Sequence, residues 1–293
     1  MNFDQNKFLI TQIQEFVDQA DKEKAQERHE KDSFWCSEAE TPVFDLYHRW
    51  IGTTPTNPPE AEKQMIFMAG KMMELALVET LGKMDLLEKP EDEQFRVEME
   101  REGVKITGYM DGVLKGGIPL EVKSYYGVYQ TKDLEAGKPR ESYLKQLAMY
   151  MDFMNAPKGK LIYLERGTGQ MFEFTLENIG EKKYKCINIE FDLEDTYKRW
   201  ARLYKNNIVP KIEPKPEYRY KKPLEEIDWH SLSSADISKA RNNQKVIGDH
   251  PWAIQYSAYK DLILEREGVK AGYTDAELER IKELTKGYST WGR

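Results

Sequence analysis

The sequence predicts an α/β protein, with a central mixed β-sheet flanked by helices and a helical C-terminal extension. Three observations lead to this fold class. Runs in which apolar and polar residues alternate, as strands require, fill much of residues 95–192. Apolar residues at helical spacing precede, interrupt and follow these runs. Residues 225–293 carry helical signals alone.

The first expected elements are helices. Residues 5–31 have apolar side chains near helical spacing, followed by a charged stretch. Asn57 is suited to an N-cap and Pro58 to the first helical position, so a strongly apolar helix is expected over about residues 58–82.

Strands and further helices follow. Glycine turns separate the runs 95–102, 104–114 and 118–126, which predicts an antiparallel meander. A helix is expected over about residues 140–155. The elements expected after it are strands over 160–166, 171–177 and 184–192 and a helix over 193–207.

Prolines set off the last part of the chain. They exclude regular structure from the segment PKIEPKPEYRYKKP. Residues 225–293 are then expected to be helical, with a capping box formed by Thr274 and Glu277.

Composition excludes several classes of protein. The chain has 293 residues, 40% of them hydrophobic, which is enough for a packed core. No apolar run reaches the roughly 18 residues of a membrane helix, and the first residues lack the form of a signal peptide. A cytoplasmic protein without a membrane partner is therefore expected. Two cysteines exclude a four-cysteine zinc site and a cysteine-held iron–sulfur cluster, and four scattered histidines argue against a histidine-rich metal site, so carboxylates would mainly have to hold any metal.

The charge is unevenly distributed. A net charge of −7 argues against a nucleic-acid partner. However, residues 1–100 carry 22 acidic and 11 basic side chains, whereas residues 101–293 carry 29 and 33. The acidity belongs to the first third of the chain, and the rest can present a basic face.

The residues that suggest chemistry lie in two neighbouring strands. Alternate residues of a strand share a face, so Glu121 and Lys123 point together. Pairing across the turn at Gly116–Gly117 can bring Asp111 alongside them. Two carboxylates and an ammonium would suit a hard divalent cation and a lysine that positions or deprotonates water. Such charges on a hairpin are more often only solvated, so the pattern needs support from its flanks.

Two helices supply that support. Gly70 and Glu74 lie four residues apart, where the glycine permits close approach to a sheet beside a carboxylate. Gln146 and Tyr150 have the same spacing on a helix that is otherwise apolar on that face. In this order, the residues resemble the PD-(D/E)XK nuclease superfamily, in its RecB-like and phage-type exonuclease branch, over about residues 37–166.

This resemblance implies a restriction-endonuclease-like core and a role for each residue. Lys123 would serve the attacking water, and Gln146 and Tyr150 would orient phosphate or solvent. Several relatives hold an iron–sulfur cluster through cysteines that this chain lacks, so no such cluster is expected. The groups that would hold Mg²⁺ or Mn²⁺ are Asp111, Glu121, the carbonyl of Val122 and, directly or through water, Glu74.

The segment 204–222 interleaves basic and aromatic side chains. Its candidate contacts to single-stranded nucleic acid, through phosphate pairing and base stacking, are Lys215, Arg219, Tyr220 and Lys221. A solvated linker between the core and the helical tail has the same composition and is slightly favoured.

The sequence thus predicts a metal-dependent deoxyribonuclease, most simply an exonuclease acting at DNA ends in recombination or repair. The alternatives are a structure- or sequence-specific endonuclease and a non-catalytic DNA-binding or assembly subunit. Expected partners are DNA, a recombination or single-strand-annealing protein and further copies of the chain. The expected regions are an N-terminal charged helical segment (1–36), the nuclease core (37–207), a linker (208–224) and a helical C-terminal extension (225–293).

Overall fold

The chain divides into two compact units. The first consists of Met1–Thr41, Trp50–Gly52 and Pro59–Ile212. The second consists of Pro42–Arg49, Thr53–Pro58 and Glu213–Arg293. The helix predicted over residues 5–31 lies outside the residues that the structure describes. The computed structural model describes residues 33–57, 61–88, 95–204, 213–215, 224–244, 246–247, 254, 257–266 and 273–287.

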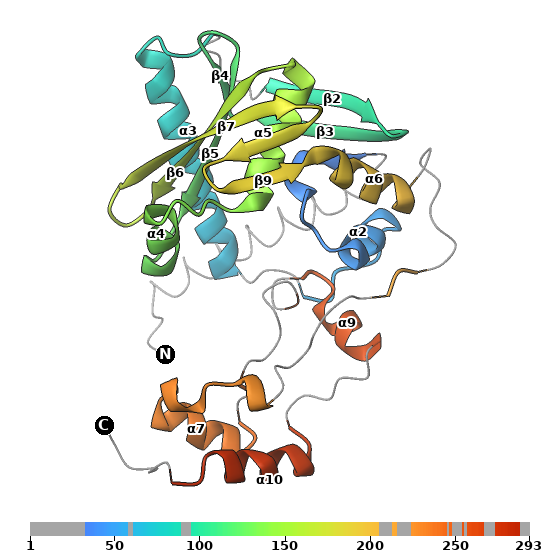
Figure 1. The fold of residues 1–293 in the computed structure, drawn as a ribbon, viewed down its shortest axis with the longest axis vertical. Coiled ribbons are helices and arrows are strands. Elements are labelled where there is room, and N and C mark those ends of the chain that lie inside the picture. Colours follow the sequence, from blue (N-terminus) through green and yellow to red (C-terminus); the bar gives the residue numbers. More distant parts are fainter. Residues whose placement is uncertain are drawn as a thin grey trace, which may run out of the picture. The chain divides into compact units, whose positions relative to one another are not determined.

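The first unit is built on a six-stranded mixed sheet (Figure 1). In spatial order its strands are β4 (Gly112–Leu114), β5 (Ile118–Tyr125), β6 (Lys158–Glu165), β7 (Met171–Gly180), β8 (Lys183–Cys186) and β9 (Ile189–Asp192). Only β5 and β6 are parallel neighbours. They can be parallel because the helices α4 (Val128–Glu135) and α5 (Glu141–Met154) lie between them in the chain.

Helices cover both faces of this sheet. On one face, Val122 of β5 and Ile162 of β6 pack with side chains of α3 (Ala61–Lys83). On the other face, a Cβ built at Gly159 of β6 would lie 2.9 Å from Leu147 of α5. Residues 159 and 162 point to opposite faces because side chains alternate along a strand. The predicted fold class, an α/β protein with a mixed sheet flanked by helices, is therefore confirmed.

The predicted meander of three strands is not a single sheet, because its strands are divided between the six-stranded sheet and a second, three-stranded sheet. The strand order of this second sheet is β1 (Phe34–Trp35), β3 (Val104–Met110) and β2 (Phe95–Arg101), with β1 parallel to β3 and β2 antiparallel to it. One continuous strand over 104–114 is wrong, because the chain leaves β3 at Asp111 and enters the six-stranded sheet as β4. At this point, the Asp111 side chain bonds to β5 in place of backbone.

The strand predicted over residues 184–192 is also wrong. Ile187 has a φ of 54°, a left-handed conformation that ends β8 and turns the chain into β9. The local pattern alternates correctly on both sides of the turn. However, it contains no glycine at the turning residue, which is the usual sequence signal for such a conformation.

Aromatic rings fill the region between the smaller sheet and α6 (Leu193–Leu203). Phe34 stacks on Trp200 with ring centroids 4.7 Å apart, and Trp50 stacks on Tyr204 at 4.0 Å. All four side chains are buried. Burying one large apolar side chain stabilises a fold by roughly 1.5–3 kcal/mol, so this cluster holds β1 firmly against α6.

The described part of the second unit is helical, as predicted for the C-terminal extension. The capping box is confirmed: Thr274 N donates to Glu277 Oε2 at 2.7 Å, and Glu277 N donates to Thr274 Oγ1 at 3.3 Å. None of the described helices combines the length and apolar character needed to span a membrane. The principal helices are α2 (Val43–Trp50, of which Trp50 is assigned to the first unit), α7 (Ser234–Arg241), α9 (Lys260–Arg266) and α10 (Asp275–Leu284).

Within the second unit, an early segment packs with the end of the chain. Thr56 N and Asn57 N both donate to the carbonyl of Ala258, at 2.8 and 2.9 Å. His48 of α2 lies 2.8 Å from Glu213 through Nε2. A buried cluster also joins the two segments, and its members are Phe44, Ile254, Tyr259 and Ile263.

Candidate functional site

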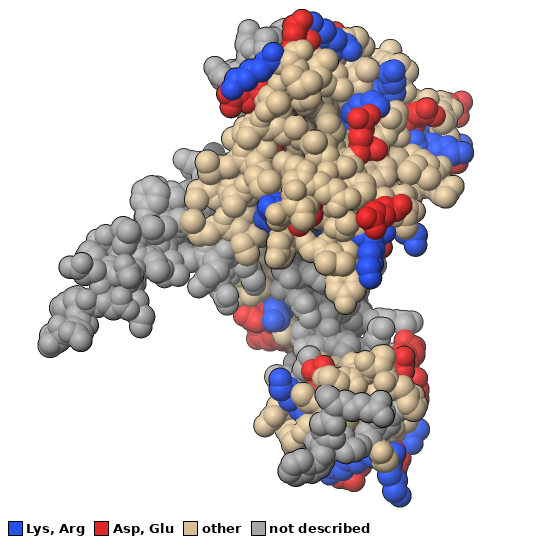
Figure 2. All heavy atoms as spheres, turned by 90° about the vertical axis from the view of Figure 1, so that its left-hand side faces the viewer, with Lys and Arg blue, Asp and Glu red and all other residues tan. Residues whose placement is uncertain are grey.

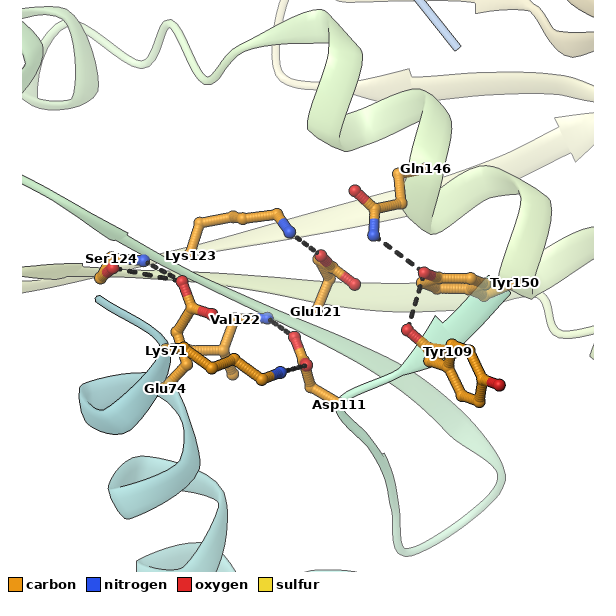
Figure 3. Close-up of polar contacts among 10 residues, drawn as sticks. All are labelled: Lys71, Glu74, Tyr109, Asp111, Glu121, Val122, Lys123, Ser124, Gln146 and Tyr150. Atoms are coloured by element: carbon orange, nitrogen blue, oxygen red, sulfur yellow. Dashed lines mark hydrogen bonds and ion pairs between the residues drawn. The ribbon is translucent and has the colours of Figure 1, made fainter. Parts of the chain in front are cut away.

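The candidate site is arranged along the second half of β5 (Figure 3). In the described chain, β4 pairs with β5 only as far as Leu120. Beyond that residue, side chains meet the backbone of β5. Asp111 Oδ2 accepts from Val122 N at 2.8 Å, and Glu74 Oε1 accepts from Ser124 N at 2.9 Å. Two carboxylates thus replace a neighbouring strand, because backbone donors inside a protein need partners.

Glu74 reaches β5 because α3 approaches the sheet closely. A Cβ at Gly70 would lie 2.6 Å from Ser124 Oγ, closer than real Cβ atoms come. The same hydroxyl donates to Glu74 Oε1 at 3.2 Å. The close approach predicted for Gly70 is therefore confirmed, and it determines where the Glu74 carboxylate lies.

Glu121 and Lys123 form an ion pair on one face of β5, as strand alternation predicts. Glu121 is only 1% exposed, and its Oε2 is buried without a hydrogen-bond partner in the described structure. Burial raises the pKa of Glu121 to about 8; Lys123 opposes this effect, whereas Asp111 and Glu74 add to it. Burial alone would lower the pKa of Lys123, but the carboxylates of Glu121, Asp111 and Glu74 together outweigh it and raise that pKa.

Gln146 and Tyr150 of α5 form a short chain of hydrogen bonds. Gln146 Nε2 donates to the Tyr150 hydroxyl at 2.8 Å, and that hydroxyl donates to the Tyr109 carbonyl at 2.9 Å. Burial raises the pKa of Tyr150 well above its usual value, and the charge of Glu121 adds to the effect. The pair therefore holds the end of β3, two residues before Asp111 (Figure 3).

Other side chains border the site and were missed from the sequence. Lys71 Nζ lies 3.9 Å from Asp111 Oδ1. The Tyr143 ring centroid lies 5.2 Å from Lys123 Nζ and 5.9 Å from Arg140 Cζ. The helical spacing of Lys71 from the α3 carboxylate was an available signal. The missed residues are Lys71, Ser124, Arg140 and Tyr143.

The predicted nucleic-acid contacts of the segment 204–222 are only partly described. Lys215 is exposed and belongs to the second unit. Arg219, Tyr220 and Lys221 lie outside the described residues. Their role stays a prediction.

The donor set fits a hard divalent cation that keeps several waters. Within the described part of the chain, no three His, Cys, Asp or Glu side chains gather into a cluster that could hold a metal ion. Asp111 and Glu121 supply two carboxylates, and the Val122 carbonyl points to the same strand edge as the Val122 N–H. One or two carboxylates with waters are a usual set for Mg²⁺. A cation would also give the buried Glu121 Oε2 a partner.

Comparisons with known proteins give a likeness of structure only. No family model matches the chain, and no curated protein matches it. Among solved structures, the chain is similar to SSO0001, with a TM-score of 0.43 and 18% identity over 65% of this chain and 84% of that one. It is also similar to an alkaline exonuclease from Laribacter hongkongensis, LHK-Exo, with a TM-score of 0.32 and 12% identity over 54% and 82% of the two chains. The LHK-Exo complex with dAMP has a TM-score of 0.30 and 13% identity over 50% and 78%. Similarity at this level has no bearing on what this chain acts on, which depends on its own residues.

Proposed function

We propose that the chain is a metal-dependent deoxyribonuclease, an exonuclease that acts at DNA ends in recombination or repair. The observation that supports this most strongly is the buried carboxylate of Glu121, with one oxygen on Lys123 and the other without a partner in the described structure. Burying charged groups costs free energy, and shifted ionisable groups concentrate at functional sites. A scaffold has no use for such a cluster.

Each residue has a role in this proposal. A bound cation would stabilise the charge on a phosphoryl group as a Lewis acid. Lys123, held by Glu121, places its ammonium where negative charge develops on the phosphate. Gln146 and Tyr150 fix the end of β3 and so position the residue that follows it. The proposed ligands of Mg²⁺ or Mn²⁺ are Asp111, Glu121, the carbonyl of Val122 and, through water, Glu74.

Cleavage of labelled linear DNA tests the activity. We expect nucleotide release with Mg²⁺ or Mn²⁺ and none with a chelator. Lys123→Ala should lower the rate on the order of a thousandfold, while DNA binding stays nearly unchanged, because one cation contributes little to affinity. Lys115→Ala is a matched control, since this lysine pairs with Asp85 at 2.5 Å in an exposed position. If Lys123→Ala loses binding as much as cleavage, the lysine is a phosphate anchor instead.

Covalently closed circular DNA, used as a substrate, distinguishes an exonuclease from an endonuclease. The acidic first 100 residues favour contact confined to an end, because they repel a duplex lying broadly on the surface. We expect linear DNA to be digested and covalently closed duplex to stay intact. Nicking of the circle at a comparable rate would instead identify an endonuclease. DNA and metal binding without any cleavage would identify a non-catalytic subunit, with a recombination or single-strand-annealing protein or further copies of the chain as proposed partners.

A further inference from the structure

Exposed aromatic side chains follow the end of β5, next to the candidate site. Tyr126 and Tyr129, called here the rim tyrosines, are 74% and 87% exposed, and Val128 between them is 67% exposed. Aromatic side chains usually bury much of their ring, so two neighbouring rings in water give up apolar burial. Figure 2 views the side of the first unit that carries α3 and α4; the middle of that face carries few charged side chains, which gather towards its upper and right-hand edges.

Glu165 joins the backbone beside the rim tyrosines to the turn that follows β6. Glu165 Oε1 accepts from Gly127 N at 3.5 Å, and Glu165 Oε2 accepts from Gly167 N at 2.7 Å. A Cβ at Gly167 would lie 3.4 Å from Tyr126 Cε2, so this ring rests against the turn between β6 and β7. A ring that is held in place before binding loses less entropy when a planar ligand packs on it.

A series of contacts runs from Gln130, the residue that follows Tyr129, to the ring beside Lys123. Arg140 Nε donates to Gln130 Oε1 at 2.8 Å, one residue after Tyr129 in α4. The Arg140 guanidinium and the Lys123 ammonium lie near the same ring, that of Tyr143. Residues 123–145 carry five Lys and Arg side chains against three acidic ones. Three of these cations, Lys132, Lys138 and Arg140, are exposed, as binding of phosphates beside stacked bases requires.

We propose that the rim tyrosines stack on unpaired bases of single-stranded DNA, whose phosphates Arg140 binds next to Lys123. This inference rests on the proposed nuclease function and names its substrate, which is DNA with a single-stranded segment at the site. Rings can reach the faces of unpaired bases, whereas the base faces inside a duplex already stack on one another. Base–aromatic stacking tolerates any sequence, because every base has a π-face.

Binding measured without cleavage tests the inference. A single-stranded oligonucleotide containing 2-aminopurine is titrated with the full chain in the presence of chelator, and stacking is expected to quench its fluorescence. Tyr126→Ala and Tyr129→Ala should each weaken binding on the order of tenfold and reduce the quenching. Tyr126→Phe and Tyr129→Phe should keep both, because the ring is retained. Ile179→Ala is the surface control, since this side chain is 46% exposed near the opposite end of β7.

Each other outcome contradicts the inference. Unchanged affinity in both alanine variants would exclude stacking, and equal loss in the phenylalanine variants would assign the effect to the hydroxyl groups. Equal weakening for a blunt duplex would exclude the single-stranded ligand, as would a wild-type chain that binds no oligonucleotide. Failure of the nuclease function appears separately, as absence of cleavage in Mg²⁺ or Mn²⁺ by a chain that still binds and quenches the oligonucleotide.

Discussion

The buried carboxylate of Glu121 interacts with three other charged groups of the site. Glu121 has Lys123 on one oxygen, and the charges of Asp111 and Glu74 raise its pKa further. Removing one member of such a group changes the charge that its neighbours experience, while an isosteric amide keeps the shape. Amide variants therefore separate charge from packing.

The first prediction concerns these amides. Asp111→Asn keeps a carbonyl oxygen for the Val122 N–H, so the fold should stay intact. Both Asp111→Asn and Glu121→Gln should weaken Mn²⁺ binding, measured by calorimetry, on the order of tenfold or more, because a hard cation prefers charged oxygen ligands. Glu173→Gln, whose side chain is 59% exposed, is the control. Mn²⁺ affinity equal to that of the wild type in both amide variants would refute the proposed ligands.

The two cysteines give a second prediction. Burial raises the pKa of Cys186 to about 11, and burial together with the charges of Glu121 and Glu38 raises that of Cys36 further. Only the thiolate reacts with aromatic disulfides, so both thiols should react slowly at pH 8 in the native chain and rapidly after unfolding. In Cys186→Ser, the remaining thiol should react more slowly than the one left in Cys36→Ser. Reaction of native Cys36 at the rate of a free thiol would contradict this.

At the scale of elements, the packing of α3 on β5 decides the position of Glu74. A helical Gly→Ala change ordinarily stabilises a protein by about 1 kcal/mol. At Gly70, however, the added Cβ would displace the Ser124 hydroxyl from Glu74. The gain in helix stability and the clash therefore oppose each other. The clash involves Ser124 Oγ, which the substitution Ser124→Ala removes.

A double-mutant cycle measures this coupling. We expect Gly70→Ala to be more favourable in the Ser124→Ala background than in the wild type, by about 1 kcal/mol or more in the free energy of unfolding. Ser124→Ala alone should have a small effect, because the Ser124 N–H still donates to Glu74. Additive effects within about 0.3 kcal/mol would show that α3 does not approach the sheet as closely as described.

Local patterns predicted the type of most elements, and long-range packing decided the rest. The run 118–126 is β5, and the helix expected over 140–155 is α5. α4 was missed because its segment VYQTKDLE has no clear apolar period. The strand break at Asp111 was missed because it depends on which strand becomes the neighbour.

The candidate site divides in the same way. Alternation along one strand placed Glu121 and Lys123 on one face. The contact between Lys71 and Asp111 depends on how α3 is rotated about its axis and how near it lies to the sheet. The spacing within the sequence places Lys71 near Glu74 on the helix, but it encodes neither the rotation of α3 nor its distance from the sheet. The exposure of the rim tyrosines likewise follows from how the end of β5 and the start of α4 are placed, which the sequence pattern does not reveal.

At the scale of the whole molecule, the second unit contains a buried histidine that links acid to stability. Burial lowers the pKa of His48, although Glu213 acts to raise it. The unfolded chain therefore binds this proton more readily than the folded one. Stability should be unaffected above the unfolded pKa of about 6.5 and should fall as the pH drops below it, until the folded pKa is reached.

Urea unfolding at pH 7.5 and 5.5 checks this dependence. The wild type should lose more stability between the two pH values than His48→Gln does, by on the order of 1 kcal/mol. For each protein, the free energy of unfolding at pH 5.5 is subtracted from that at pH 7.5. The constant cost of losing the contact with Glu213 in the variant therefore cancels. An equal loss in the variant would assign the acid sensitivity to other groups.

The second unit is assembled from segments that lie far apart in the chain, and this has a consequence for folding during protein synthesis. Phe44 emerges from the ribosome about 210 residues before Ile254, its partner in a buried cluster. At about 5–20 residues per second, this corresponds to a wait on the order of 10–40 s. During that time, the first unit can already assemble from residues up to 212, whereas the early segment of the second unit still lacks the cluster that covers it. A nascent chain stalled before residue 254 should therefore expose Phe44 to chaperones even when the first unit has folded.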